Sequence, residues 1–171
     1  QQFRLEVIDA SAIVGSGSVI GTLGDDVIVG SNGNDVLTGL GGSDVIYGLG
    51  GDDFFSISAG TLVGGAGDDT YAPADGDTLI IEQAGEADTL TFGFGALDFS
   101  VADIRRVGDD LVLFRNSGSA ITIQDHYLGG SYQLDWFSSA GVPGNPRAEG
   151  SWTARAFEAF DGRLQARGFA E

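Results

Sequence analysis

Several residue types are missing from this sequence of 171 residues, and each absence excludes a class of site. There is no cysteine, which excludes disulfides, thiolate metal sites and a cysteine nucleophile. There is no lysine, and 25 acidic residues against eight basic ones give a formal net charge of -17. Nucleic acid is therefore not an expected partner, because its phosphates are bound by basic side chains. No apolar run reaches the roughly 18 residues that cross a bilayer, so we expect no transmembrane segment.

Glycine and aspartate are concentrated between residues 21 and 77, and there they recur every nine residues. Four consecutive nonapeptides, GTLGDDVIV, GSNGNDVLT, GLGGSDVIY and GLGGDDFFS, begin at Gly21. A fifth, GGAGDDTYA, begins at Gly64, and the intervening segment 57–63 is two residues short and has no acid. Glycine occupies positions one and four, aspartate position six and a large apolar residue position eight. This period indicates a repeat architecture rather than a disordered acidic tail.

Each nonapeptide has the composition of a tight turn followed by a three-residue strand. Glycine supplies the backbone conformations that a turn needs, and the middle residue of each strand (Ile28, Leu37, Ile46 and Phe55) points to one side. Two nonapeptides make one full turn of a coil, with parallel strands on two faces. One unit cannot bury its apolar side alone, so stability requires several stacked units.

Stacking brings together aspartates that are 18 residues apart, so Asp26 faces Asp44 and Asp35 faces Asp53. Carboxylates at this distance repel one another unless a cation lies between them. Calcium fits best, because it takes six to eight oxygen ligands from carboxylates and carbonyls, whereas magnesium requires stricter geometry. The nonapeptides contain no nitrogen or sulfur side-chain ligands that would suit zinc or copper. We expect several calcium ions, held by Asp26, Asp35, Asp44, Asp53 and Asp69, by the position-four glycines Gly24, Gly33, Gly42, Gly51 and Gly67, and more weakly by Asp77 and Asp88, with Asp75 beside them.

The nonapeptides resemble the RTX (repeats-in-toxin) calcium-binding repeat, G-G-x-G-x-D-x-U-x. The segments 68–90 and 109–141 are similar to the regions that follow such repeats in secreted haemolysin-type proteins. The resemblance implies a parallel β-roll that is disordered in calcium-poor cytoplasm and folds at extracellular calcium. It also implies a secreted or cell-surface bacterial protein, exported by a type I secretion apparatus.

We predict a mainly all-β fold with three parts. Residues 1–20 form capping strands, residues 21–82 form the β-roll, and residues 83–171 form a β-rich flanking and capping region. In the flank we expect short strands at 89–94, 111–115, 120–127 and 132–137. We also expect one or two short helices, near 100–106 and at 151–165. The isolated domain is expected to be a monomer.

Catalysis is not expected in this chain. His126 is the only histidine, no serine lies in a nucleophile elbow, and the paired carboxylates are already explained by calcium. With no methionine in the sequence, we expect the chain to be a piece of a longer protein, which can itself be an enzyme or toxin. Two other functions stay open: a carbohydrate-binding or adhesive module, which needs Trp136 or Trp152 accessible, and a surface-layer structural module.

Overall fold

The computed structural model describes residues 12–74, 76–83, 87–92, 103–115, 117–128, 134, 136–139 and 152–153. Its elements are β1 (Ile13–Val14), β2 (Ser18–Ile20), β3 (Val27–Val29), β4 (Val36–Thr38), β5 (Asp44–Gly50), β6 (Phe54–Ile57), β7 (Gly60–Ala66), β8 (Thr70–Pro73), β9 (Thr78–Ile81), β10 (Thr89–Phe92), β11 (Asp103–Val107), β12 (Asp110–Phe114), β13 (Ala120–Ile123), the 3₁₀ helix η1 (His126–Leu128), β14 (Trp136–Ser139) and β15 (Trp152–Thr153).

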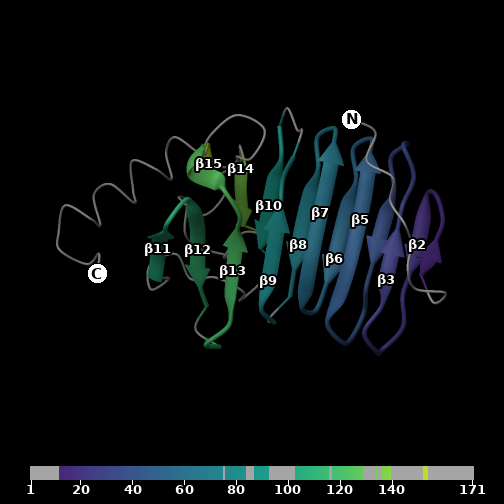
Figure 1. Ribbon diagram of the computed structural model, residues 1–171, viewed down its shortest axis with the longest axis horizontal. Helices are drawn as coiled ribbons and strands as arrows, with labels where there is room; N and C mark the ends of the chain where they lie inside the picture. Colours follow the sequence, from purple (N-terminus) through teal and green to yellow (C-terminus); the bar gives the residue numbers. More distant parts are fainter. Residues whose placement is uncertain are drawn as a thin grey trace.

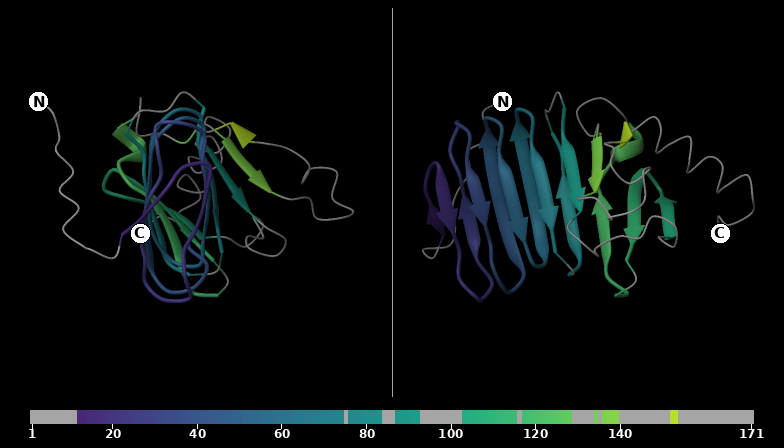
Figure 2. Two further views of the ribbon diagram at one scale, coloured as in Figure 1. Left: turned by 90° about the vertical axis from the view of Figure 1, so that its right-hand side faces the viewer. Right: turned by 180° about the vertical axis from the view of Figure 1, so that it is seen from behind.

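Successive strands alternate between two sheets, so that the chain winds as a flattened coil (Figures 1 and 2). One sheet has the order β1-β3-β5-β7-β9-β13-β12-β11 and the other has the order β15-β14-β10-β8-β6-β4-β2. Within the coil, all neighbouring strands are parallel, as in β3 with β5 and β4 with β6. The predicted β-roll is therefore confirmed, including the strand triplets that follow the first two turns.

The register places equivalent residues of alternate repeats opposite each other. Ile28 lies beside Ile46 in one sheet, and Leu37 lies beside Phe55 in the other. All four are fully buried between the sheets, as the repeat pattern predicts. Burial of each such side chain stabilises the fold by about 1.5–3 kcal/mol. Phe55 also stacks on Tyr71, with ring centroids 5.0 Å apart.

The short segment 57–63 is accommodated by a tighter turn between β6 and β7. Asp44 pairs with Gly60, which is 16 residues later instead of 18. Gly60 has a φ of 128°, and a Cβ there would lie 2.6 Å from the backbone nitrogen of Asp44. Only glycine fits so close an approach of two strands.

The strands beyond residue 100 extend the first sheet past the roll. β11, β12 and β13 form an antiparallel meander, and β13 pairs in parallel with β9. Arg115, at the end of β12, is buried and donates to the backbone oxygens of Gly76 (2.9 Å) and Pro73 (3.2 Å). The meander is thereby tied to the last turn of the roll. Arg106 and Asp109 form an exposed ion pair at the turn between β11 and β12.

The predicted helices are wrong where the structure can test them. Residues 103–106 lie in β11, because pairing with β12 satisfies their backbone groups. Trp152 and Thr153 lie in β15, and the rest of 151–165 is outside the described residues. Of the predicted strand at 132–137, Trp136 and Phe137 lie in β14 and Leu134 lies in no strand, and the other residues are outside those that the structure describes. Of the described elements, only η1 is helical, and no helix among the described residues is long and apolar enough to cross a membrane.

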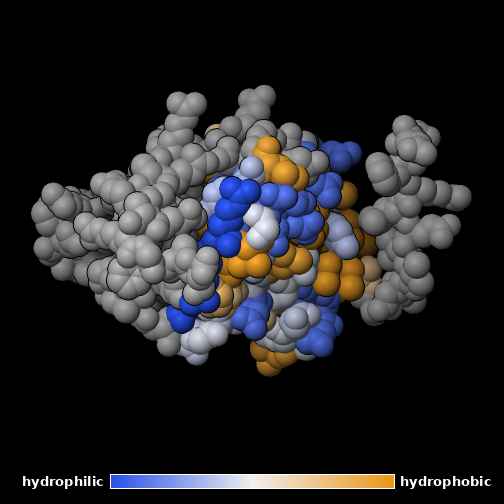
Figure 3. Space-filling view, turned by 60° about the vertical axis from the view of Figure 1, so that its left-hand side comes forward, coloured by the Kyte–Doolittle hydropathy of each residue, from blue (hydrophilic) through white to orange (hydrophobic). Residues whose placement is uncertain are grey.

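The outer surface mixes hydrophilic and hydrophobic residues (Figure 3). Leu23 at a turn and Phe54 on an outer strand face are among the exposed apolar side chains. The two-sheet core is thin, and alternation along each strand leaves every second side chain outside it.

Candidate metal centre

The position-six aspartates stack in two columns along the edges of the roll, and Asp88 continues one of them. The short column consists of Asp26, which precedes β3, and Asp44, which begins β5 in the same sheet. The long column, Asp35, Asp53, Asp69 and Asp88, precedes strands of the second sheet. In each column a carboxylate Oδ1 accepts the backbone N–H of the preceding aspartate: Asp26 to Asp44 (3.0 Å), Asp35 to Asp53 (2.8 Å), Asp53 to Asp69 (2.9 Å) and Asp69 to Asp88 (2.9 Å). The predicted stacking of carboxylates is therefore present in the folded chain.

In the first two repeats, the second carboxylate oxygen is satisfied within its own turn. Asp26 Oδ2 accepts the N–H of Thr22 at 2.5 Å and its hydroxyl at 3.0 Å. Asp35 Oδ2 accepts the same two groups of Ser31, at 2.6 Å and 2.9 Å. These turns therefore supply their own partners to the acid.

In the next three repeats, the second carboxylate oxygen has no such partner. The Oδ2 atoms of Asp44, Asp53 and Asp69 are buried without a hydrogen bond. Position two carries no hydroxyl in these turns, and its backbone is left-handed: φ is 70° at Leu40, 82° at Leu49 and 116° at Gly65. A buried carboxylate without a partner is costly, and the cost is removed by protonation or by a cation.

The pKa values of the aspartates differ between the turns that satisfy the second carboxylate oxygen and the turns that do not. Burial tends to raise the pKa of Asp35, but the hydrogen bonds from Ser31 and Gly17 outweigh it and the pKa is lowered. Burial raises the pKa of Asp44, and repulsion from Asp26 adds to it. Burial likewise raises the pKa of Asp53 to about 6 and that of Asp69 to about 7, with neighbouring carboxylates of the long column adding to both.

Glycine at position one leaves room for oxygen atoms from two successive coils. A Cβ added at Gly48 would lie 2.6 Å from the carbonyl oxygen of Gly64 and would also collide with Asp53 Oδ2. One carboxylate oxygen and one carbonyl oxygen therefore face the same point. Such a donor set, rich in oxygen and without nitrogen or sulfur, suits a hard cation of the size of calcium.

The comparison with protein families agrees with this geometry. The family model of the RTX calcium-binding nonapeptide repeat matches four copies, at residues 20–55 and 61–80, about a third of the chain. The roll is an RTX repeat domain. No curated protein matches the chain. RTX repeats are calcium-binding, so the donor set of the columns and the family lead to the same ion.

The position-four glycines of the RTX domain also stack on one another. A Cβ at Gly42 would lie 2.6 Å from the carbonyl oxygen of Gly24, and one at Gly51 would lie 2.6 Å from the carbonyl carbon of Gly33. Gly67 lies against Gly51 in the same way. Gly42, Gly51 and Gly67 have φ between 90° and 127°, whereas Gly24 and Gly33 do not adopt the left-handed region. The division between the first two turns and the later three therefore extends to the backbone.

The weaker ligand candidates occupy different places. Asp88 is buried in the long column, although its spacing from Asp69 has drifted to 19 residues. Asp77 is exposed and outside both columns, and its Oδ1 accepts the N–H of Ala120 at 2.8 Å, which helps to dock β13. Asp75 lies outside the described residues, as do the side chains of Trp136 and Trp152 on which a carbohydrate platform depends.

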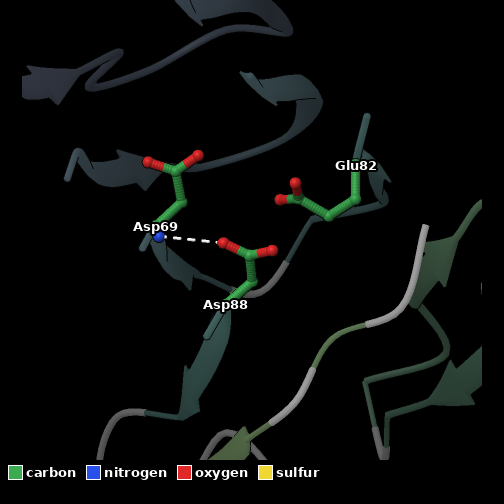
Figure 4. Close-up of side chains that lie close together, drawn as sticks. All are labelled: Asp69, Glu82 and Asp88. Atoms are coloured by element: carbon green, nitrogen blue, oxygen red, sulfur yellow. Dashed lines mark hydrogen bonds between the residues drawn. The ribbon is translucent and has the colours of Figure 1, made fainter. Parts of the chain in front are cut away.

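One acid beside the long column, Glu82, is not among the predicted ligands. Glu82 is fully buried just after β9, and its carboxylate points toward the space between Asp69 and Asp88 (Figure 4). Oxygen atoms of these three residues lie within 4.8 Å of one another. The available signal was the strand alternation, which turns residues 78, 80 and 82 to the same side, but Glu82 lies outside the aspartate pattern from which the ligands are predicted.

Proposed function

We propose that the RTX domain of this chain is a calcium-dependent folding module whose ions lie along the two aspartate columns. The observation that carries the proposal is the set of three buried Oδ2 atoms, on Asp44, Asp53 and Asp69, that have no hydrogen-bond partner. Calcium would be bound by these oxygens together with carbonyl oxygens of the adjacent glycine turns. Asp26 and Asp35 have a lesser share, because Thr22 and Ser31 already occupy their second oxygens.

Folding and calcium binding are coupled in this proposal. Without a cation, stacked carboxylates repel one another, and the thin core alone offsets little of the ordering entropy. An ion that binds only the folded roll stabilises it by about 2.7 kcal/mol when free calcium is 100 times the dissociation constant. Several ions therefore decide whether the chain folds.

The direct test is a circular dichroism spectrum with chelator and again with millimolar calcium. We expect disorder in the first case and β-structure in the second, with isothermal titration calorimetry giving the number of ions. Magnesium at the same concentration is the control, and it should not produce the change. A spectrum that is the same in chelator and in calcium would refute the coupling.

Export follows from the same coupling. A chain that stays unfolded in calcium-poor cytoplasm can pass through a type I secretion apparatus and fold outside the cell, which fits a secreted or cell-surface protein. The RTX repeats and the absence of cysteine are compatible with this route. Secretion from cells that carry such an apparatus, compared with cells that lack it, tests this part of the proposal.

The proposed role is not enzymatic. His126, the only histidine, is buried in η1, and burial lowers its pKa to about 4. Such a side chain is neutral at physiological pH and has no access to a substrate from solvent. A structural role in the packing around Tyr127, whose ring it meets edge-on at 5.2 Å, accounts for it.

A further inference from the structure

Glu82 occupies a place that belongs to glycine in the preceding coils. Val29 pairs with Tyr47, Tyr47 with Val63, and Val63 with Ile81. Continued by one residue, this register aligns the position-one glycines Gly30, Gly48 and Gly64 with Glu82. The last member of the series therefore carries a side chain with a carboxylate where the others carry none.

That side chain reaches back into the long column. A Cβ added at Gly64 would lie 2.8 Å from Glu82 Oε1 and would also collide with Asp69 Oδ2 and the hydroxyl of Tyr71. The three oxygen atoms therefore surround one point beside Gly64. In the preceding coil, the corresponding point beside Gly48 is met by Asp53 Oδ2, the Gly64 carbonyl oxygen and a ring carbon of Phe55.

Two of these oxygens lack a protein partner. Asp69 Oδ2 and the Tyr71 hydroxyl are both buried without a hydrogen bond, and each residue is at most 1% exposed. Tyr71 belongs to the core, so its hydroxyl is evidence independent of the acidic residues. Unsatisfied buried oxygens that converge on one point indicate a ligand that the folded chain holds there.

We propose that Asp69, Glu82 and Asp88 form a terminal calcium site that closes the long column. The proposal rests on the proposed function but assigns a ligand outside the nonapeptide repeat. A separation of up to 4.8 Å between their oxygens matches two ligands on one ion with bonds of 2.3–2.6 Å. The three carboxylates together carry more negative charge than one calcium ion neutralises. This site therefore differs in net charge from sites in which neutral carbonyl oxygens supply part of the ligand shell. Glu82 thereby adds a third carboxylate to those of Asp69 and Asp88 at the end of the long column.

The test compares calcium binding to the wild-type chain with binding to Glu82→Gln. Gln keeps the shape and one oxygen but removes the charge, so we expect affinity at one site to fall by about tenfold or more, or one ion to be lost. The control is Asp109→Asn, which removes the same charge from an exposed ion pair in the flank and should leave the titration unchanged. Titration calorimetry gives both affinity and stoichiometry.

A second measurement uses the wild-type chain alone, in case the variant does not fold at any calcium concentration. Crystals grown with calcium should show an anomalous peak within bonding distance of Glu82 and Asp69. A wild-type chain that binds no calcium would refute the proposed function itself. If the wild-type chain binds calcium but the map has no peak at Glu82, or Glu82→Gln titrates like the wild type, only the terminal site is refuted.

Discussion

Asp35 and Asp53 lie in adjacent coils of the long column, and they differ in the hydrogen bonding of one carboxylate oxygen, Oδ2. Both present Oδ1 to the backbone of the preceding coil. Asp35 Oδ2 accepts two hydrogen bonds from Ser31, whereas Asp53 Oδ2 is buried with none. We predict that replacement by asparagine changes stability mainly independently of calcium at Asp35 and mainly through calcium at Asp53.

The magnitudes follow from what each oxygen contacts. Asp35→Asn removes charge-assisted bonds and can turn an NH₂ group toward two donors, which costs about 1–3 kcal/mol at every calcium concentration. Asp53→Asn removes a calcium ligand, so its cost approaches about 2.7 kcal/mol at a free calcium concentration 100 times the dissociation constant. In chelator that cost vanishes. The variant then gains stability, because burial and the neighbouring Asp35 and Asp52 disfavour the charged form of Asp53.

The assay is urea unfolding at a series of fixed free calcium concentrations. The slope of the unfolding free energy against the logarithm of calcium reports the ions bound on folding. Asp35→Asn should give a line parallel to the wild type and below it, and Asp53→Asn should give a shallower line that crosses the wild type at low calcium. Parallel lines for both variants would show that the unpaired Oδ2 atom does not mark the ion.

Three further changes have defined outcomes. In chelator, acidification from pH 8 to pH 5 should increase β-structure in the circular dichroism spectrum. The pKa values of Asp53 (about 6) and Asp69 (about 7) are raised, so the folded chain binds protons more tightly than the unfolded chain does. Protonation therefore stabilises the fold at low pH, and this stabilisation is lost as the pH rises through these values. A loss of β-structure on acidification would contradict this reasoning. Phe55→Ala empties a fully buried position and should cost about 3–5 kcal/mol, seen as a higher calcium midpoint for folding; an unchanged midpoint is inconsistent with its place in the core. Leu49→Gly relieves a left-handed leucine (φ 82°) and should raise the melting temperature by the equivalent of about 1 kcal/mol, whereas Leu23→Gly, at a turn position without positive φ, should not.

Much of the roll could be predicted because the same pattern of glycine, aspartate and apolar positions recurs in five nonapeptides. Ile28 and Phe55 are buried where the period places them, and Asp35 stacks on Asp53 as an 18-residue coil requires. Each repeat has to satisfy the same physical constraint, so a position that is ambiguous in one nonapeptide can be assigned from the others. The coil also tolerates the short segment, because Gly60 lets two strands approach where the turn is missing residues.

The ends of the roll could not be predicted in the same way, because nothing there repeats. Residues 103–106 match the start of a helix, yet they form a strand because β12 pairs with them across the two-residue turn at Gly108 and Asp109. Glu82 breaks the glycine pattern, so the repeat does not predict a ligand at this position. Strand alternation turns Glu82 to the inner side, but only the strand register counted from Ile81 places it opposite the position-one glycines. Sites built from departures from a repeat require the three-dimensional stacking before they can be recognised.

The bonds from Arg115 to the carbonyl oxygens of Pro73 and Gly76 limit where this molecule can be divided. A segment that stops after β9 would leave those two carbonyls without their guanidinium and would expose the edge on which β13 lies. The smallest transferable unit therefore extends beyond the repeats to at least Ile123. A calcium-responsive module grafted from this chain onto another protein would have to include the meander, since the repeats alone end on an open sheet edge.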